Sequence, residues 1–187
     1  MEFAPTALEG AFIVRHAGRS DARGRFKRQY CEREFAAAGL ETRWVQVNHS
    51  VTIGRASIRG MHFQRPPHAE VKLVSCPVGR AFDVAVDLRR FSPTYLKWAA
   101  VEIDESTSFY IPKGCAHGFQ TLSEEVHLIY QHSAYHAPEA EGGVRFDDPG
   151  LAIAWPLGYE LQPNHPRRSN RSGRGRSNSA LSDGLSR

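Results

Sequence analysis

The sequence predicts an all-β protein of the sandwich or barrel class, and three observations lead to that prediction. Short segments alternate large apolar with polar side chains, as half-buried strands do. Turns rich in Gly, Pro, Ser and Asp separate these segments at the spacing typical of sandwiches and barrels. No long amphipathic helix interrupts the pattern, which argues against a parallel sheet with helical crossovers.

The part of the chain before residue 42 is less regular than the rest. Residues 11–30 are expected to be extended, with a tight turn at Asp21–Gly24. Residues 31–38, CEREFAAA, predict a short peripheral helix. Gly39 is expected to end that helix, because glycine readily adopts the left-handed conformation that follows a helix.

The regular strands are expected from residue 42 onward. They lie, in chain order, in the segments TRWVQVNHSV, EVKLVSCPVG, AFDVAVDLR, WAAVEI, SFYIPKG, GFQTL and EVHLIYQHSAY. In AFDVAVDLR the apolar side chains point one way, whereas Asp83 and Asp87 point the other. Charged side chains at alternate positions can face the mouth of a barrel, where small barrels bind their ligands.

The composition indicates one globular domain followed by a polar tail. The chain has 187 residues, of which 41% are hydrophobic and 24% charged, and this is ordinary for a domain with a sizeable core. We assign residues 1–162 to a single domain. Residues 163–187 are rich in Arg, Ser and Gly, and we predict that they are disordered because they cannot bury a core.

The net charge of +4 is concentrated in the tail. The tail holds six Arg and one Asp, which leaves 18 basic and 19 acidic residues in the domain. The domain is thus nearly neutral, and we expect no specific binding of nucleic acid.

Cysteine usage and hydropathy indicate a cytoplasmic protein. No apolar run is long enough to span a membrane, and residues 1–10 lack the blocks of a signal peptide. Cys31, Cys76 and Cys115 are odd in number and form no CxxC pair. We therefore expect reduced thiols, no structural zinc and no membrane partner.

Two spaced motifs bring polar side chains to the predicted barrel. The first is Pro112-x-Gly114-x-x-His117, in which Pro and Gly form a turn and the His returns to the interior. The second is His62-x-Gln64, followed by Lys72 and then by a Gly seven residues later. A charged Lys has no lone pair to offer a cation, so we expect no metal here.

These segments resemble the two sequence motifs of the cupin jelly roll, with Gln and Lys at positions that usually hold a second His and a Glu. The chain resembles one cupin family in particular, the RmlC-like dTDP-4-dehydrorhamnose 3,5-epimerases, over roughly residues 10–156. The segments that carry the resemblance are RGMHFQ, KLVSCPVGRAFDVAVDLRRFSPT, IPKGCAHGF and FDDPGLAIAWP.

The resemblance implies a metal-independent enzyme without any other cofactor. Its substrate would be a dTDP-4-keto-6-deoxyhexose, epimerised beside the ketone at one carbon or at both, in the biosynthesis of dTDP-rhamnose, other deoxysugars and lipopolysaccharide O-antigen. It also implies a cupin jelly roll that forms a homodimer, with the N-terminal segment of one subunit contributing to the site of its partner.

The resemblance further implies roles for individual residues. His62 takes the position of the base, Lys72 that of the cation that stabilises the enolate, and Tyr130 that of the acid. The chemistry agrees, because neutral His is a suitable base near pH 7 and a fixed cation stabilises charge that develops on the ketone oxygen. The substrate-binding positions are Arg23, which would reach across the dimer, and Gln46, Asn48, Arg59, His117 and Glu141.

Two departures from the family pattern leave an alternative open. Arg28 stands where DxRGxFxE ends in Glu, and after residue 156 no Asp matches the one that orients the catalytic His. Asp83 is a candidate to replace it. If nothing does, the chain would be a non-catalytic cupin that binds sugar nucleotides. Three further histidines have no convincing ligand spacing and are interpreted as surface or edge residues: His127, His132 and His136.

Overall fold

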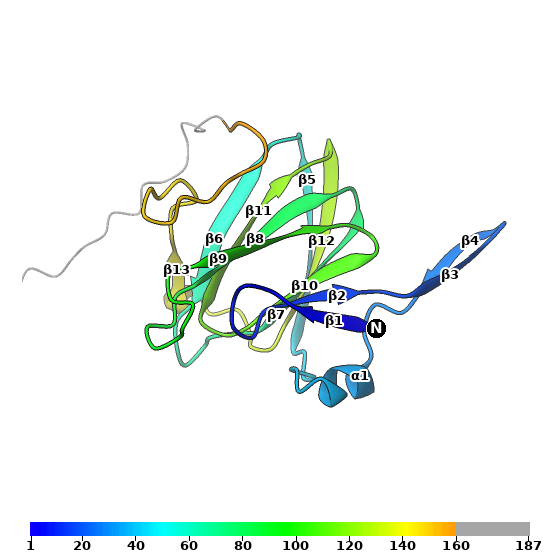
Figure 1. Ribbon diagram of the computed structural model, residues 1–187, viewed down its shortest axis with the longest axis horizontal. Helices are drawn as coiled ribbons and strands as arrows, with labels where there is room; N and C mark the ends of the chain where they lie inside the picture. The colour runs from blue at the N-terminus through cyan, green and yellow to red at the C-terminus, as the bar shows by residue number, and fades with distance from the viewer. Residues whose placement is uncertain (160–187) are drawn as a thin grey trace, which may run out of the picture.

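The computed structural model describes residues 1–159 and confirms the all-β prediction (Figure 1). Two antiparallel sheets provide its layers. The first has the order β1-β2-β10-β7-β12-β5 and the second the order β13-β6-β11-β8-β9. The predicted tail, 163–187, lies outside the described residues.

The strands of the first sheet are β1 (Glu2–Pro5), β2 (Phe12–Arg15), β5 (Gln46–Ile53), β7 (Lys72–Val78), β10 (Thr107–Ile111) and β12 (Glu125–His132). Those of the second sheet are β6 (Ile58–Gln64), β8 (Ala81–Asp87), β9 (Trp98–Ile103), β11 (Cys115–Thr121) and β13 (Glu141–Gly143). The remaining elements are the hairpin of β3 (Gly18–Asp21) and β4 (Gly24–Lys27), helix α1 (Glu32–Ala37) and a 3-10 turn, Pro138–Ala140. Over residues 1–159 no helix is both long and apolar enough to cross a membrane.

The main core lies between the two sheets. Val74, Phe109 and Leu128 of the first sheet belong to the same buried cluster as Ala85 and Phe119 of the second. These side chains occupy alternate strand positions, so the intervening residues face outward from each sheet.

Both sheets are also covered on their outer faces. The predicted helix is confirmed as α1, and its Phe35 packs with Leu73 and Tyr110 on the outside of the first sheet. Leu151, from the segment after β13, packs with Met61 and other side chains on the outside of the second sheet. Asp83 and Asp87 lie on the same side of β8 as Ala85, so both carboxylates point into the interior between the sheets and are buried there.

A bulge in β6 shapes the wall of the barrel mouth. β6 contributes one residue more than β11 between the pairs His62–His117 and Arg59–Phe119. Gly60 lies in this bulge with φ 121, and a Cβ there would come within 2.5 Å of Cα of Gly118. Glycine is therefore required for β6 and β11 to approach so closely.

The β3–β4 hairpin extends away from the body of the molecule (Figure 1). Most of its residues are exposed, including Phe26, whose exposed fraction is 81%. It includes the predicted Asp21–Gly24 turn, where Arg23 forms its hydrogen bonds and ion pair with Asp21.

Candidate active site

The candidate site begins with two histidines on neighbouring strands of the second sheet. His62 on β6 lies directly opposite His117 on β11, and opposed residues of antiparallel strands share one face of the sheet. A regular strand would point Arg59 and His62 in opposite directions, because they are three residues apart. The extra residue in the bulge at Gly60 places Arg59 on the same face as His62. Arg59 lies opposite Phe119, whose side chain points into the core between the sheets.

His117 forms a buried pair with Asp83. Its Nε2 lies 2.6 Å from Oδ1 of Asp83, and the carboxylate has no exposed surface. Burial raises the pKa of Asp83, while the neighbouring His117 opposes that rise. Within residues 1–159 the second carboxylate oxygen has no hydrogen-bond partner. Asp83 thus lies near the pocket, but the histidine that it orients is His117, whereas the sequence suggested it as the partner of His62.

Tyr130 faces this pair from the first sheet. Its ring centroid lies 5.9 Å from that of His117 in an edge-on arrangement, and its hydroxyl lies 3.4 Å from Oγ of Ser50. Burial raises the pKa of Tyr130 far above its ordinary value, so its hydroxyl stays protonated at neutral pH. The charge of Arg59 opposes that rise to a smaller extent.

Lys72, the first residue of β7, is also buried and forms an ion pair that the sequence did not suggest. Its Nζ lies 3.2 Å from Oε1 of Glu70, and the exposed fractions of the two side chains are 10% and 9%. The other oxygen of Glu70 lies 3.0 Å from Nδ1 of His132. The interpretation of His132 as a surface or edge residue was therefore wrong, because its side chain is buried beside Tyr130 and β12 lies between β7 and β5.

Gln46 and Asn48 on β5 are connected to this ion pair by hydrogen bonds. Nε2 of Gln46 donates to Oδ1 of Asn48 at 3.2 Å. Asn48 lies opposite Tyr130 in the sheet, and its Nδ2 lies 3.4 Å from Nε2 of His132. Hydrogen bonds thus link the two predicted substrate contacts, through His132 and Glu70, to Lys72.

Gln64 holds the loops around the site together. Its Nε2 lies within 3.2 Å of the His68 carbonyl, the Tyr135 carbonyl and Oε2 of Glu70, and its Oε1 accepts from the Ala137 amide at 2.6 Å. At the position where metal-binding cupins have a ligand, this chain has a buried amide engaged in internal hydrogen bonds. Gln64 and Lys72 therefore do not fit a metal centre.

Arg23 lies apart from this cluster, whereas Glu141 lies opposite Gln64 in the pairing of β13 with β6. The side chain of Arg23 is 91% exposed on the hairpin. Glu141 starts β13, with its carboxylate exposed and 3.8 Å from Nε2 of His136, while its carbonyl accepts from Arg65. The segment after Trp155, where the family's orienting Asp is missing, lies largely outside the described residues.

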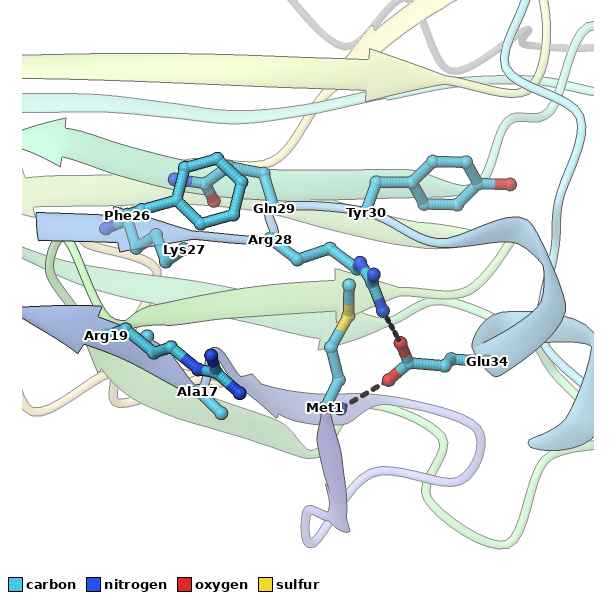
Figure 2. Close-up of a pocket in the computed structure, with 10 residues that line it drawn as sticks. Met1, Ala17, Arg19, Phe26, Lys27, Arg28, Gln29, Tyr30 and Glu34 are labelled. Atoms are coloured by element: carbon cyan, nitrogen blue, oxygen red, sulfur yellow. Dashed lines mark hydrogen bonds and ion pairs between the residues drawn. The ribbon is translucent and has the colours of Figure 1, made fainter.

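A groove of about 780 Å³ lies at the base of the hairpin, and none of the predicted catalytic side chains lines it (Figure 2). Arg28 and the amino group of Met1 both pair with Glu34 at its edge, the Arg28 contact being 2.8 Å long. These two contacts lower the pKa of Glu34 to about 2. Arg28, which stands where the family has Glu, is thus neutralised within its own chain.

Glu70 and His132 are the site residues that sequence reasoning missed. A signal for His132 was present, because it lies two residues from Tyr130 on β12 and so shares its strand face, whereas Glu70 precedes β7 and lies outside that strand. The contact between Glu70 and His132 becomes visible only when β7 pairs with β12, because this pairing places Lys72 opposite His132.

The chain is similar to one well-defined group of proteins. Residues 5–182 match a family model described as dTDP-4-dehydrorhamnose 3,5-epimerase. An enzyme of that name from Methanothermobacter thermautotrophicus is 42% identical over 157 residues, which cover 83% of this chain and 84% of the relative.

Solved structures agree with this match. The crystal structure of NovW, a 4-keto-6-deoxy sugar epimerase of Streptomyces spheroides, superposes with a TM-score of 0.83 at 40% identity, covering 87% of this chain and 83% of that one. RmlC of Legionella pneumophila, solved with dTDP-4-keto-L-rhamnose, gives 0.81 at 36% identity and 86% coverage of each chain. The likeness confirms the predicted RmlC-like cupin jelly roll.

Proposed function

The chain belongs to the dTDP-4-dehydrorhamnose 3,5-epimerase family, whose members are enzymes of deoxysugar biosynthesis, and on that premise we propose a mechanism for its own residues. The substrate is a dTDP-4-keto-6-deoxyhexose, and the reaction inverts a carbon beside the ketone. The alternative of a non-catalytic binding cupin gains no support, since the relatives compared above are named as epimerases.

The observation that carries the mechanism is that the base and the acid come from opposite sheets. His62 projects from β6 of the second sheet on the face that it shares with His117. Tyr130 projects from β12 of the first sheet and faces His117 across the interior. A sugar ring held between them would present one face to an imidazole and the other to a phenol, which is the geometry that inversion needs.

The steps follow from this arrangement. His62 removes the proton from the carbon beside the ketone, and the bonding electrons move onto the ketone oxygen to form an enolate. The ammonium group of Lys72 stabilises the negative charge that develops on that oxygen. Tyr130 then delivers its proton to the same carbon from the opposite face, and the ketone is restored. Solvent exchange returns His62 and Tyr130 to their starting protonation states.

The remaining predicted residues bind and orient the substrate. Arg59 lies on the same face as His62, where its guanidinium suits the diphosphate of the nucleotide. His117, held by Asp83, and the pair Gln46 and Asn48 would contact the sugar. Glu141, at the edge of the second sheet, is a further proposed contact.

The decisive experiment is deuterium incorporation from heavy water into dTDP-4-keto-6-deoxyglucose, followed by NMR. We expect exchange at C3, C5 or both, and the pattern identifies which carbons are epimerised. A His62→Ala protein serves as the control and should lose the exchange. If the wild-type protein exchanges no faster than this control, the enzyme assignment is wrong, and ligand binding retained in that case would indicate a binding cupin.

We further propose a homodimer in which the hairpin of one subunit reaches the site of the other. Among residues 1–159, the hydrogen bonds and the ion pair of Arg23 join it to Asp21 and to no other predicted site residue. The outer face of β5 is mostly apolar and exposed in the single chain, with Val47, Val51 and Ile53 exposed by 61%, 45% and 69% alongside His49. A second copy covering this face would bury these side chains and place a hairpin near its neighbour.

The dimer is tested by light scattering during gel filtration. The wild-type protein should elute with twice the mass of one chain, whereas Ile53→Glu should shift it towards the monomer, because a charge would be buried in the interface. Phe91→Glu is the matched control, since Phe91 is fully exposed on the loop after β8. A wild-type protein with the mass of one chain at micromolar concentration would contradict the proposal.

A cytoplasmic location is also proposed. All three cysteines are free, and two of them, Cys76 and Cys115, are buried. Free thiols suit a reducing compartment. Burial raises the pKa of both buried thiols to about 12, so they remain unreactive at neutral pH.

A further inference from the structure

We propose that Glu70 is a positioning residue for Lys72, held in place by His132 and Gln64. This inference rests on the proposed function, because it takes Lys72 as the group that stabilises the enolate. Nothing in the sequence motifs assigns Glu70 a role, and its importance follows from the contacts that converge on it.

The first argument is the burial of the ion pair. Lys72 and Glu70 lie 3.2 Å apart with about nine-tenths of each side chain covered. An ammonium group buried to this extent is costly unless a partner compensates its charge. Without Glu70, rotamers that carry the ammonium group of Lys72 towards solvent would be favoured over the one that points into the site.

The second argument is that three donors share two acceptor oxygens. Lys72 contacts Oε1 of Glu70, while His132 and Gln64 both contact Oε2, at 3.0 and 3.2 Å. A carboxylate can accept all three, whereas a glutamine would present its own NH₂ group to at least one donor. The pKa of Glu70 lies below its ordinary value, because the contacts with His132 and Lys72 outweigh the rise that burial alone would cause.

The third argument is the direction of the hydrogen bonds. The amide NH₂ of Asn48 donates to Nε2 of His132, so the ring proton of His132 lies on Nδ1 and is donated to Glu70. Oδ1 of Asn48 in turn accepts from Gln46. Asn48 on β5 therefore orients His132, and His132 orients the Glu70 carboxylate that pairs with Lys72. The same strand carries the proposed sugar contacts, Gln46 and Asn48.

Asp83 also lies near Lys72, but its carboxylate already has a partner. Burial raises the pKa of Asp83 on β8 and the charge of Lys72 slightly opposes this rise, but the carboxylate of Asp83 bonds to His117. Among residues 1–159, Glu70 is the one carboxylate that forms an ion pair with Lys72. Loss of Glu70 would leave no equivalent partner in place.

The test compares Glu70→Gln with Glu125→Gln. We expect Glu70→Gln to lower kcat by about 10- to 100-fold, the range for losing a hydrogen bond to a charged group, and to change KM by less than about threefold. Glu125 also forms a carboxylate–histidine pair, with His127 at 2.7 Å, but it is exposed outside the site. Glu125→Gln should leave kcat unchanged.

A double-mutant cycle separates positioning from a general structural effect. If Glu70 acts through Lys72, adding Glu70→Gln to Lys72→Met should not lower the residual rate further, as measured by deuterium exchange over hours. Equal losses in both backgrounds would overturn the inference. If Glu70→Gln fails to fold in thermal melting, Glu70→Asp replaces it. This variant keeps the charge but is too short to reach both Lys72 and His132, so its kcat should still fall.

The outcomes also distinguish this inference from the proposed function. Wild-type kcat in Glu70→Gln, together with a large loss in Lys72→Met, overturns the positioning role alone. Wild-type kcat in Lys72→Met overturns the role of Lys72 itself, and with it both proposals about this residue.

Discussion

The Lys72→Met protein is expected to bind dTDP as the wild-type protein does but to epimerise its substrate about 1,000-fold more slowly, the upper range for losing one preorganised oxyanion contact. The reason is that the ammonium group acts on charge that exists only after the proton has left. Methionine has a similar volume and no charge, so the change removes the electrostatic contribution while largely preserving the packing.

The measurement for Lys72→Met is kcat by NMR, together with the affinity for dTDP by calorimetry. Lys113→Met provides the control, because Lys113 is an exposed cation in the turn before β11. It should retain the wild-type kcat. A Lys72→Met protein with kcat within about threefold of wild type would show that the enolate is stabilised by another group.

Tyr130→Phe is expected to separate proton exchange from inversion. His62 would still remove and return a proton on its own face, so deuterium should continue to enter the substrate. Delivery from the opposite face would be lost, and formation of the epimer should fall by 10²-fold or more, as is typical for removal of a general acid. The buried hydroxyl is suited to this role because its raised pKa keeps it protonated.

The Tyr130 experiment follows both products in one NMR time course in heavy water. Tyr110→Phe is the matched control, because Tyr110 is also buried but its hydroxyl accepts from the Glu41 amide outside the site. It should leave both rates unchanged. Equal loss of exchange and inversion in Tyr130→Phe would assign Tyr130 to binding or to the first proton transfer rather than to the acid step.

Much of the fold could be predicted because it rests on local patterns. Alternating side chains indicated the strands, and CEREFAAA followed by Gly39 indicated the helix that forms at α1. The pattern did not show which faces would be covered. The alternation placed Asp83 and Asp87 on the opposite face of β8 from Val84 and Val86, but it did not show that this face is enclosed between the two sheets, where both carboxylates are buried.

The candidate site was predictable where a motif fixed the strand face. His62, Lys72 and His117 were identified from their spacing to turn glycines, and the pairing of β6 with β11 brings the two histidines together. Glu70 and His132 belong to no motif. They meet because Glu70 lies just before β7, which is paired with β12, although 62 residues separate Glu70 from His132 in the chain.

The sequence by itself thus determined the class of fold, the family and the chemical groups that could catalyse the reaction, since periodicity and motif spacing are local properties. Tertiary structure alone decided the partners of those groups: Asp83 for His117, and Glu70 for Lys72. The physical reason is that charge compensation in a buried site depends on distances across the barrel. Strand pairing sets these distances, and spacing along the chain does not encode them.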